Sequence, residues 1–214
     1  MSTRTLSRAP AARRSRIRSG LRRRRRRLGL VVGVGVLAAL LATVVLPRLP
    51  DALRELTLPL HHEDIIRQQA AAKRLDPSLV AAVIYTESRF RDQTSHAGAR
   101  GLMQITPATA RFIARDSGGT AFTHEDLATP QINIAYGAYY LRYLIDHYGG
   151  NETLAVAAYN AGQTNVDRWV RAAGGPDSFD PAKDIPFPET RGYVHGVASH
   201  RDDYRHHYAN ELGY

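Results

Sequence analysis

A run of nineteen residues without a charge, LGLVVGVGVLAALLATVVL (28–46), most constrains how this chain can fold. At about 1.5 Å of rise per residue, a helix of this length just crosses the roughly 30 Å hydrocarbon layer of a bilayer. Six consecutive arginines, 22–27, precede it, and Pro47 follows it. The segment is predicted to be a single transmembrane helix, so the residues on its two sides cannot share a core.

The residues before this segment are strongly basic. Residues 1–27 hold twelve arginines, a composition that cannot bury a core and predicts a disordered tail. Residues 1–50 carry +13 and the whole chain carries +9, so the remaining residues carry −4. The positive-inside rule then predicts a cytoplasmic N-terminus, with residues 51–214 in the periplasm or cell-wall space.

Two other interpretations of the N-terminal region compete with a membrane anchor. A cleaved signal peptide would have a shorter apolar core and an A-x-A-like cleavage site, and we find neither. An arginine-rich arm could bind nucleic acid, but the topology signal already explains the arginines, so no nucleic-acid partner is expected. Gly29 and Gly33 match the small-xxx-small pattern, which predicts at most a weak self-association of the membrane helix.

The rest of the chain indicates an all-α domain. Residues 47–60 mix proline with charge and read as a linker, and residues 61–214 form the predicted domain. We expect at most a small β element near 93–105, and a last helix from 189 that is broken or weakened at Gly192 and Gly196. The other expected helices span 61–75, 76–90, 106–117, 129–148, 151–162 and 165–173. The apolar stripe expected on the 129–148 helix is Ile132, Ala135, Tyr139, Tyr140, Tyr143 and Leu144.

No metal or other cofactor is expected. The chain has no cysteine, which excludes disulfides and thiolate ligands. Its nine histidines include two adjacent pairs, but neighbouring residues point apart on a helix and no H-x-x-x-H spacing occurs.

The stretch VAAVIYTESRF (80–90) places a carboxylate where a buried face is expected. Leu79, Val83 and Glu87 share one row of the predicted helix, because residues four apart lie on the same face. Glu87 also falls in the last turn, where the helix dipole disfavours a negative charge. Burial and dipole both raise a carboxyl pKa, so Glu87 could hold a proton near neutral pH. Taken alone, a Glu at a frayed helix end reaching back to solvent is the simpler interpretation.

Three further stretches complete a pattern. The first, SHAGARGLMQITPATA (95–110), has glycines around a turn, followed by the amide side chain of Gln104. The second, AAYNAG (157–162), ends an apolar helix. The third, IPFPETRGYV (185–194), begins the last predicted helix. In this order and spacing, ESRF, GARGLMQ, AYNAG and ETRGYV resemble the soluble lytic transglycosylase family of peptidoglycan-cleaving enzymes. The resemblance covers about residues 62–208 and implies a lysozyme-like, mainly helical fold with a cleft for a glycan strand.

The resemblance implies a role for each motif. It assigns Glu87 as the catalytic residue and implies that the Tyr159 hydroxyl hydrogen-bonds it. The residues it implies for the glycan cleft are Ser95, Gln104, Tyr159, Asn160, Glu189 and Tyr193. The implied reaction cleaves the β-1,4 bond between N-acetylmuramic acid and N-acetylglucosamine and forms a 1,6-anhydro sugar, with Glu87 as single acid and base.

Two alternatives stay open at this stage. A lysozyme-type hydrolase on the same fold would need a second carboxylate to position water. Asp92 follows five positions after Glu87, but it reads as a solvated turn residue. A non-catalytic peptidoglycan-binding module is disfavoured, because Glu87, Gln104 and Tyr159 are all present.

Overall fold

The computed structural model describes residues 29–30, 32–37, 39–45, 55–118 and 123–214. The chain divides into two compact units, Met1–Arg54 and Glu55–Tyr214. The predicted transmembrane segment includes residues 28, 31, 38 and 46, which lie outside the described residues. Within the described residues, no helix combines the length and the apolar character that a membrane crossing requires.

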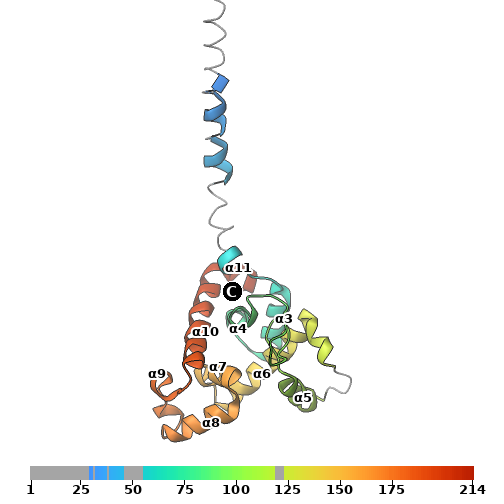
Figure 1. Ribbon diagram of the computed structural model, residues 1–214, viewed down its shortest axis with the longest axis vertical. Coiled ribbons are helices and arrows are strands. Elements are labelled where there is room, and N and C mark those ends of the chain that lie inside the picture. Colours follow the sequence, from blue (N-terminus) through green and yellow to red (C-terminus); the bar gives the residue numbers. More distant parts are fainter. Residues whose placement is uncertain (1–28, 31, 38, 46–54, 119–122) are drawn as a thin grey trace, which may run out of the picture. The chain divides into compact units, whose positions relative to one another are not determined.

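The second unit is helical, as the sequence predicted (Figure 1). Its helices are α3 (Glu63–Lys73), α4 (Pro77–Ser88), α5 (Pro107–Asp116), α6 (Pro130–His147), α7 (Glu152–Ala161), α8 (Gln163–Ala172), α9 (Pro181–Asp184), α10 (Pro188–His207) and α11 (Ala209–Leu212). Short 3₁₀ helices lie at His124–Ala128 and Pro176–Ser178. The predicted proline-rich loop therefore contains two short helical turns.

The starts of the helices follow local signals in the sequence. Asp76 caps α4 by accepting a 2.9 Å hydrogen bond from the Ser78 backbone N–H, and Pro77 occupies the first helical position. Thr106 caps α5 and Asn151 caps α7 in the same way. Because these interactions reach only a few residues, the boundaries could be predicted without the tertiary structure.

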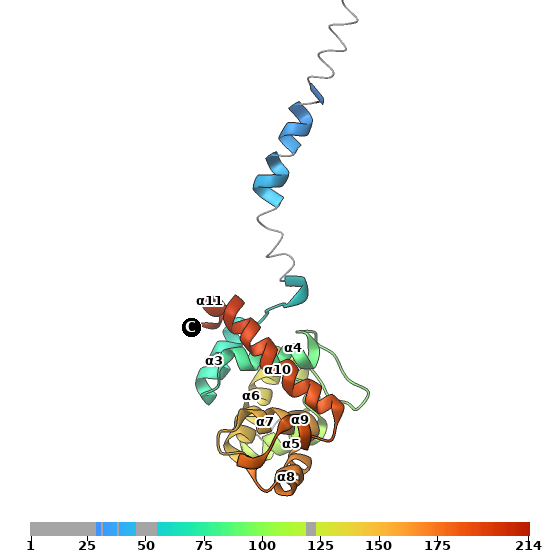
Figure 2. The ribbon, with the colours of Figure 1, turned by 90° about the vertical axis from the view of Figure 1, so that its left-hand side faces the viewer.

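Helix α4 lies at the centre of the unit. Its residues from Leu79 to Ile84 are at most 2% exposed, so this helix is buried on nearly all sides. Helix α10 runs beside α4 and α7 in both views (Figures 1 and 2), and it packs against both. This packing holds the C-terminal end of α4 against the first half of α10.

Two expectations about helices hold only in part. Helix α10 is continuous from Pro188 to His207, so Gly192 and Gly196 do not break it. An interior glycine costs only about 1 kcal/mol, which packing against two neighbouring helices can offset. On α6 the buried face is Asn133, Ile134, Gly137, Ala138, Leu141, Leu144 and Ile145, so of the predicted stripe only Leu144 is fully buried.

The expected β element is minimal. Thr94 pairs with Arg100 and Arg100 pairs with Ile105 as isolated antiparallel bridges. The described part of the chain contains no longer strand. The mainly helical class is therefore confirmed, and the bridges fix a compact turn between α4 and α5.

Residues just after the first unit pack on the helical domain. The hydroxyls of Tyr85, Tyr208 and Tyr204 donate to the carbonyls of Thr57, Leu58 and Pro59, at 2.7, 2.8 and 2.6 Å. Leu58 and Leu60 are buried. The end of the predicted linker is thus part of the folded unit.

Candidate active site

Glu87 lies in the last turn of α4 and is half-buried. The helix then ends abruptly, because Arg89 and Phe90 both adopt left-handed backbone angles, with φ of 51° and 61°. Such angles are strained for residues with side chains, and strain of this kind gathers at functional sites. Gln93, in the loop that follows, donates from Nε2 to the Glu87 backbone carbonyl at 3.3 Å.

Burial raises the pKa of Glu87 to about 7, while a hydrogen bond from Tyr193 opposes part of that increase. The cause is the loss of hydration of the charged form, as predicted from the position of Glu87 on a buried helix. A carboxyl group with this pKa is partly protonated at neutral pH. It can therefore donate a proton and later accept one.

Tyr193 holds this carboxyl group. Its hydroxyl donates to Oε1 of Glu87 at 2.6 Å, and its side chain is buried on α10. Burial and the nearby charge of Glu87 raise the Tyr193 pKa well above its ordinary value, so the phenol remains a donor. This hydrogen bond engages Oε1 and not Oε2.

The expectation that Tyr159 hydrogen-bonds Glu87 was wrong. The Tyr159 hydroxyl donates instead to the backbone carbonyl of Met103 at 2.9 Å. Tyr159 is still close to the acid, because the charge of Glu87, after burial itself, raises the pKa of this phenol. Its position at the end of α7 directs the hydroxyl towards the turn that follows α4, and α10 supplies the partner of Glu87.

The GARGLMQ turn is shaped by one buried amide. The Asn133 side chain is fully buried on α6 and donates to the carbonyls of Arg100 and Leu127, at 2.9 and 3.0 Å. Its Oδ1 accepts from the Met103 N–H at 2.8 Å. These bonds fix the backbone segment that provides the carbonyl partner of Tyr159.

Glycine is required at two positions beside this amide. A Cβ on Gly101, whose φ is +80°, would lie 2.0 Å from Asn133 Nδ2 and 2.5 Å from the Leu127 carbonyl oxygen. A Cβ on Gly137 would lie 2.2 Å from the sulfur of Met103. Gly101 of the turn and Gly137 of α6 are therefore glycines because the turn and α6 approach each other too closely for a side chain at either position.

Gln104 and Ser95 stabilise the same turn. Gln104 has a left-handed backbone, with φ of 48°, and its Nε2 donates to the carbonyls of Gly101 and Gln93, at 2.8 and 3.0 Å. Ser95 Oγ accepts from the Ala99 N–H at 3.0 Å. Both side chains are half-buried, and their hydrogen bonds hold the backbone of the turn between α4 and α5.

Asn160 and Glu189 lie at the junction of α7 and α10. Asn160 Oδ1 accepts from the Thr190 hydroxyl at 2.8 Å, which ties the end of α7 to the start of α10. Glu189 is exposed in the first turn of α10, four residues before Tyr193 and on the same face. The structure therefore brings Tyr159 and Tyr193 close to Glu87. Ser95 and Gln104 hydrogen-bond within the turn, and Asn160 and Glu189 lie where α7 meets α10.

Two contributing residues were missed from the sequence. One is Asn133, whose signal was a polar residue on the buried face of a helix, the same signal that identified Glu87. The other is Ser88, a buried residue whose hydroxyl donates to the Leu102 carbonyl at 2.7 Å. Ser88 links the end of α4 to the glycine turn, a contact that no local pattern indicates.

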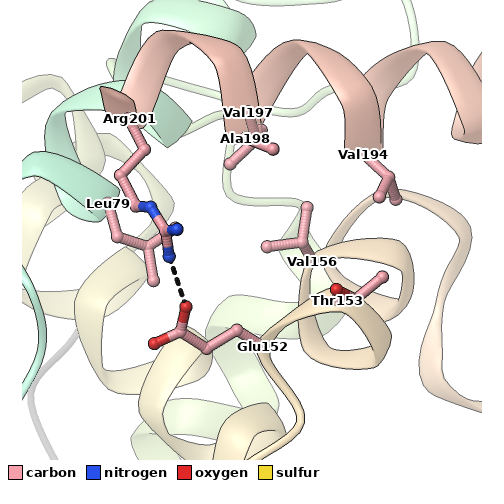
Figure 3. Close-up of a pocket in the computed structure, with 8 residues that line it drawn as sticks. All are labelled: Leu79, Glu152, Thr153, Val156, Val194, Val197, Ala198 and Arg201. Carbon is pink, nitrogen blue, oxygen red and sulfur yellow. Dashed lines mark hydrogen bonds and ion pairs between the residues drawn. The ribbon is translucent and has the colours of Figure 1, made fainter. Parts of the chain in front are cut away.

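The pocket shown in Figure 3 lies away from this group. It is a hollow of about 90 Å³ between α4, α7 and α10. Arg201 and Glu152 form a 2.7 Å ion pair at its side. Its lining residues are Leu79, Glu152, Thr153, Val156, Val194, Val197, Ala198 and Arg201, and none of them is a predicted site residue. Leu79 is two turns before Glu87, roughly 12 Å along the helix axis.

Among the described residues, no group of three or more histidine, aspartate or glutamate side chains is arranged to hold a metal ion.

The mainly helical domain, with Glu87 at the end of its central helix, belongs to the lysozyme-like class of proteins. The family model of the transglycosylase SLT domain matches residues 64–180, more than half of the chain, and the chain belongs to this family.

The soluble lytic murein transglycosylase of Escherichia coli K12 is 35% identical over 162 residues, which cover 74% of this chain and 25% of that protein. Membrane-bound lytic murein transglycosylase C of Klebsiella pneumoniae is 31% identical over 164 residues, covering 66% of this chain and 45% of that protein. The structure of an inactive mutant of the Pseudomonas aeruginosa lytic transglycosylase Slt aligns with a TM-score of 0.66 at 33% identity, over 74% of this chain and 26% of that one. This chain thus spans about a quarter of the length of the first of these relatives.

Proposed function

We propose that the protein is a peptidoglycan lytic transglycosylase that cleaves the β-1,4 bond between N-acetylmuramic acid and N-acetylglucosamine. The observation that carries the proposal is a half-buried Glu87 with a pKa of about 7, oriented by Tyr193. Relatives named lytic murein transglycosylases support the same reaction class.

Glu87 acts first as the acid. Its protonated carboxyl group donates to the glycosidic oxygen, and that bond to the muramyl C1 breaks. The substrate's own N-acetyl group relieves the positive charge that develops at the sugar ring. Because Tyr193 engages Oε1, the proton is delivered from Oε2.

Glu87 then acts as the base. The ionised carboxylate takes the proton of the muramyl C6 hydroxyl, whose oxygen closes onto C1. Glu87 is protonated again at the end, and the product is a 1,6-anhydromuramic acid. No water is consumed, so a second carboxylate is not needed.

Other residues of the motifs contribute through position. Tyr159 and Gln104 stabilise the turn around Met103, and we propose that they line the glycan cleft together with Ser95, Asn160, Glu189 and Tyr193. Support comes from their hydrogen bonds around the turn and from the junction of α7 with α10.

We further propose that residues 28–46 anchor the protein in the cytoplasmic membrane. The N-terminus would lie in the cytoplasm and residues 51–214 in the periplasm or cell-wall space. The argument rests on the uncharged run and on the arginines that precede it. Two relatives that are named membrane-bound lytic murein transglycosylases support a membrane association of this kind.

Mass analysis of digested peptidoglycan tests the proposed reaction. The full chain should release muropeptides ending in 1,6-anhydromuramic acid, one water lighter than lysozyme products. Reducing muropeptides would favour the hydrolase instead, with exposed Asp92 and Glu189 as the candidate second carboxylates. Binding without cleavage would favour the non-catalytic module.

A further inference from the structure

The segment Glu55–Leu60, which we call the strap, is hydrogen-bonded to both α4 and the end of α10. On the α4 side, the Tyr85 hydroxyl donates to the Thr57 carbonyl at 2.7 Å. On the α10 side, two tyrosine hydroxyls donate to the next two carbonyls, from Tyr208 to Leu58 at 2.8 Å and from Tyr204 to Pro59 at 2.6 Å. Three consecutive carbonyls of the strap are therefore bound by two different parts of the helical domain.

Apolar packing holds the strap in the same place. The side chains of Leu58 and Leu60 are 8% and 9% exposed and belong to the hydrophobic core. The fully buried ring of Tyr204 contacts the rings of Tyr85 and Phe90, with centroids 6.2 and 6.1 Å away. The strap is thus bound by hydroxyl groups at the edge of a packed aromatic cluster.

The strap connects the same two helices as the bond between Tyr193 and Glu87. Tyr85 lies two residues before Glu87 on α4. Tyr193 lies on α10, eleven residues before Tyr204, which is about 16 Å along the helix axis. Because the Tyr193 bond is only 2.6 Å long, a small rotation or sliding of one helix against the other would weaken it.

The strap lies outside the part of the chain that the family model describes. That match covers residues 64–180, so it contains Tyr85 but neither the strap nor Tyr204 and Tyr208. The motifs that identify the family therefore do not account for these three hydrogen bonds.

From this arrangement we infer that Tyr85, Tyr204 and Tyr208 are positioning residues, which act through the strap to keep the Tyr193 hydroxyl on Glu87. The inference rests on the proposed function, because the turnover that these residues support is that of Glu87. Release of the strap gives α4 and α10 more freedom to move against each other. Glu87 then loses both its orientation and the hydrogen bond that opposes the increase of its pKa.

Two phenols face the carboxyl group of Glu87. They are Tyr193 on α10 and Tyr159 on α7, and burial together with the charge of Glu87 keeps the pKa of both well above the ordinary value. Both phenols therefore stay protonated when Glu87, with a pKa of about 7, loses its proton.

The charged groups beside the strap are separate from Glu87. His200 of α10 has its ring centroid 4.5 Å from that of Tyr85, and the Arg89 guanidinium carbon lies 5.9 Å from the same ring. His61 lies 3.6 Å from Glu55. Burial lowers the pKa of His200, so this residue gains its charge on the acidic side of the range in which Glu87 titrates. A decline of activity above neutral pH therefore reports Glu87.

Two variants of the full chain release the strap from opposite sides. Tyr85→Phe removes the hydroxyl on α4, and Tyr204→Phe/Tyr208→Phe removes the two hydroxyls at the end of α10, while every ring is kept. Each should lower kcat on isolated peptidoglycan about three- to tenfold with little change in KM. Each should also move the alkaline decline of kcat/KM to higher pH. Tyr204 is about 16 Å from Tyr193 along α10, so a local effect on Glu87 would not produce the shift in the double variant.

A double-mutant cycle tests whether the strap acts through Tyr193. In the Tyr193→Phe background, releasing the strap should cause no further shift of the pH midpoint, because the bond that it protects is already absent. Tyr139→Phe is the matched control. It removes a 2.7 Å hydroxyl bond to Asp116, away from the strap, and should leave the midpoint unchanged.

Hydrogen exchange shows whether the tyrosines hold the strap. The amides of Thr57, Leu58 and Leu60 should exchange faster in the triple variant Tyr85→Phe/Tyr204→Phe/Tyr208→Phe than in the wild type. Unchanged exchange would overturn the inference, because the three hydroxyls would then not be what holds the segment.

Two kinetic outcomes would also overturn the inference while leaving the proposed reaction intact. One is a released strap with an unmoved pH midpoint. The other is a further shift of equal size in the Tyr193→Phe background, which would mean that the strap acts by another route. Absence of anhydro products from the wild type would instead contradict the proposed function.

Discussion

The phenolic hydroxyl of Tyr193 donates a 2.6 Å hydrogen bond to Oε1 of Glu87, across 106 residues of sequence. The bond joins the end of the central helix α4 to the first half of α10. It orients the carboxyl group and opposes part of the pKa increase that burial causes. The position and the acidity of Glu87 therefore depend on the same contact.

Replacing Tyr193 with phenylalanine should reduce turnover more than substrate binding. The change keeps the ring and removes the hydrogen bond to the carboxyl group. A bond of this kind contributes about 1.5–3 kcal/mol, so kcat should fall about ten- to a hundredfold. The full chain and the variant would be compared on isolated peptidoglycan. Equal kcat values would show that Tyr193 only fills space.

The activity of the wild type should decline above neutral pH. Since Glu87 must be protonated to act as the acid, kcat/KM should fall with a midpoint near its pKa of about 7. The bond from Tyr193 lowers that pKa, so Tyr193→Phe should move the decline to higher pH. Tyr159→Phe is the matched control, because its hydroxyl bonds Met103 and the midpoint should not move. A midpoint near pH 4.5 in the wild type would contradict the burial argument.

The sequence was sufficient to predict those features that depend on a short stretch of neighbouring residues. Asp76 and Asn151 cap their helices through groups two or three residues away. Glu87 was identifiable because a carboxyl group sat on an apolar helix row. The choice between Tyr159 and Tyr193 as its partner depended on how α7 and α10 are rotated about α4, which neither motif encodes alone.

The error on α6 has a related cause. Tyrosines count as apolar in a periodicity argument, yet Tyr139, Tyr140 and Tyr143 lie half-exposed beside the buried face. Asn133 and Gly137 were left out because they are polar or small, although both pack against the GARGLMQ turn. A stripe drawn from hydrophobicity misses positions that are buried for hydrogen bonding or for close approach.

Gly101→Ala should destabilise the domain far more than Gly118→Ala. Both glycines have similar left-handed backbones, with φ of +80° and +76°, so the conformational strain of alanine is nearly the same. Only at Gly101 would the new Cβ meet Asn133 and Leu127, whereas nothing lies within 4 Å at Gly118. Urea denaturation should show a difference of about 2 kcal/mol or more. Equal destabilisation would mean that the turn can move away from α6.

Protease accessibility in cells tests the proposed topology. Protease added outside intact spheroplasts should degrade the domain after residue 51 and spare the arginine-rich N-terminus, because the positive-inside rule retains arginines in the cytoplasm. Antibodies against each end of the full chain would report the fragments, and a cytoplasmic protein would serve as the control for lysis. Protection of the domain would remove its access to mature peptidoglycan and contradict the proposed substrate as well.

Glu87→Gln should abolish cleavage while leaving glycan binding intact. Glutamine keeps the shape and can still accept the hydrogen bond from Tyr193, but it can neither donate the proton nor take one from the C6 hydroxyl.

The Glu87→Gln substitution also removes a group whose pKa in the folded protein is raised from 4.5 to about 7. A carboxyl group with a raised pKa reduces stability as pH increases from its unfolded value to its folded value. The variant should therefore be more stable than the wild type at pH 8, and this difference should shrink towards pH 4.

Muropeptide release and thermal unfolding at both pH values would check these two consequences of Glu87→Gln together. Asp92→Asn is the control, since Asp92 is exposed and a mechanism with one carboxylate does not need it. This variant should retain cleavage and show no comparable gain in stability at pH 8. If it lost cleavage as completely as Glu87→Gln, a two-carboxylate hydrolase would become the better description. Substantial cleavage by Glu87→Gln would overturn the assignment of Glu87 as the acid, because the proposed reaction has no other group that supplies the proton.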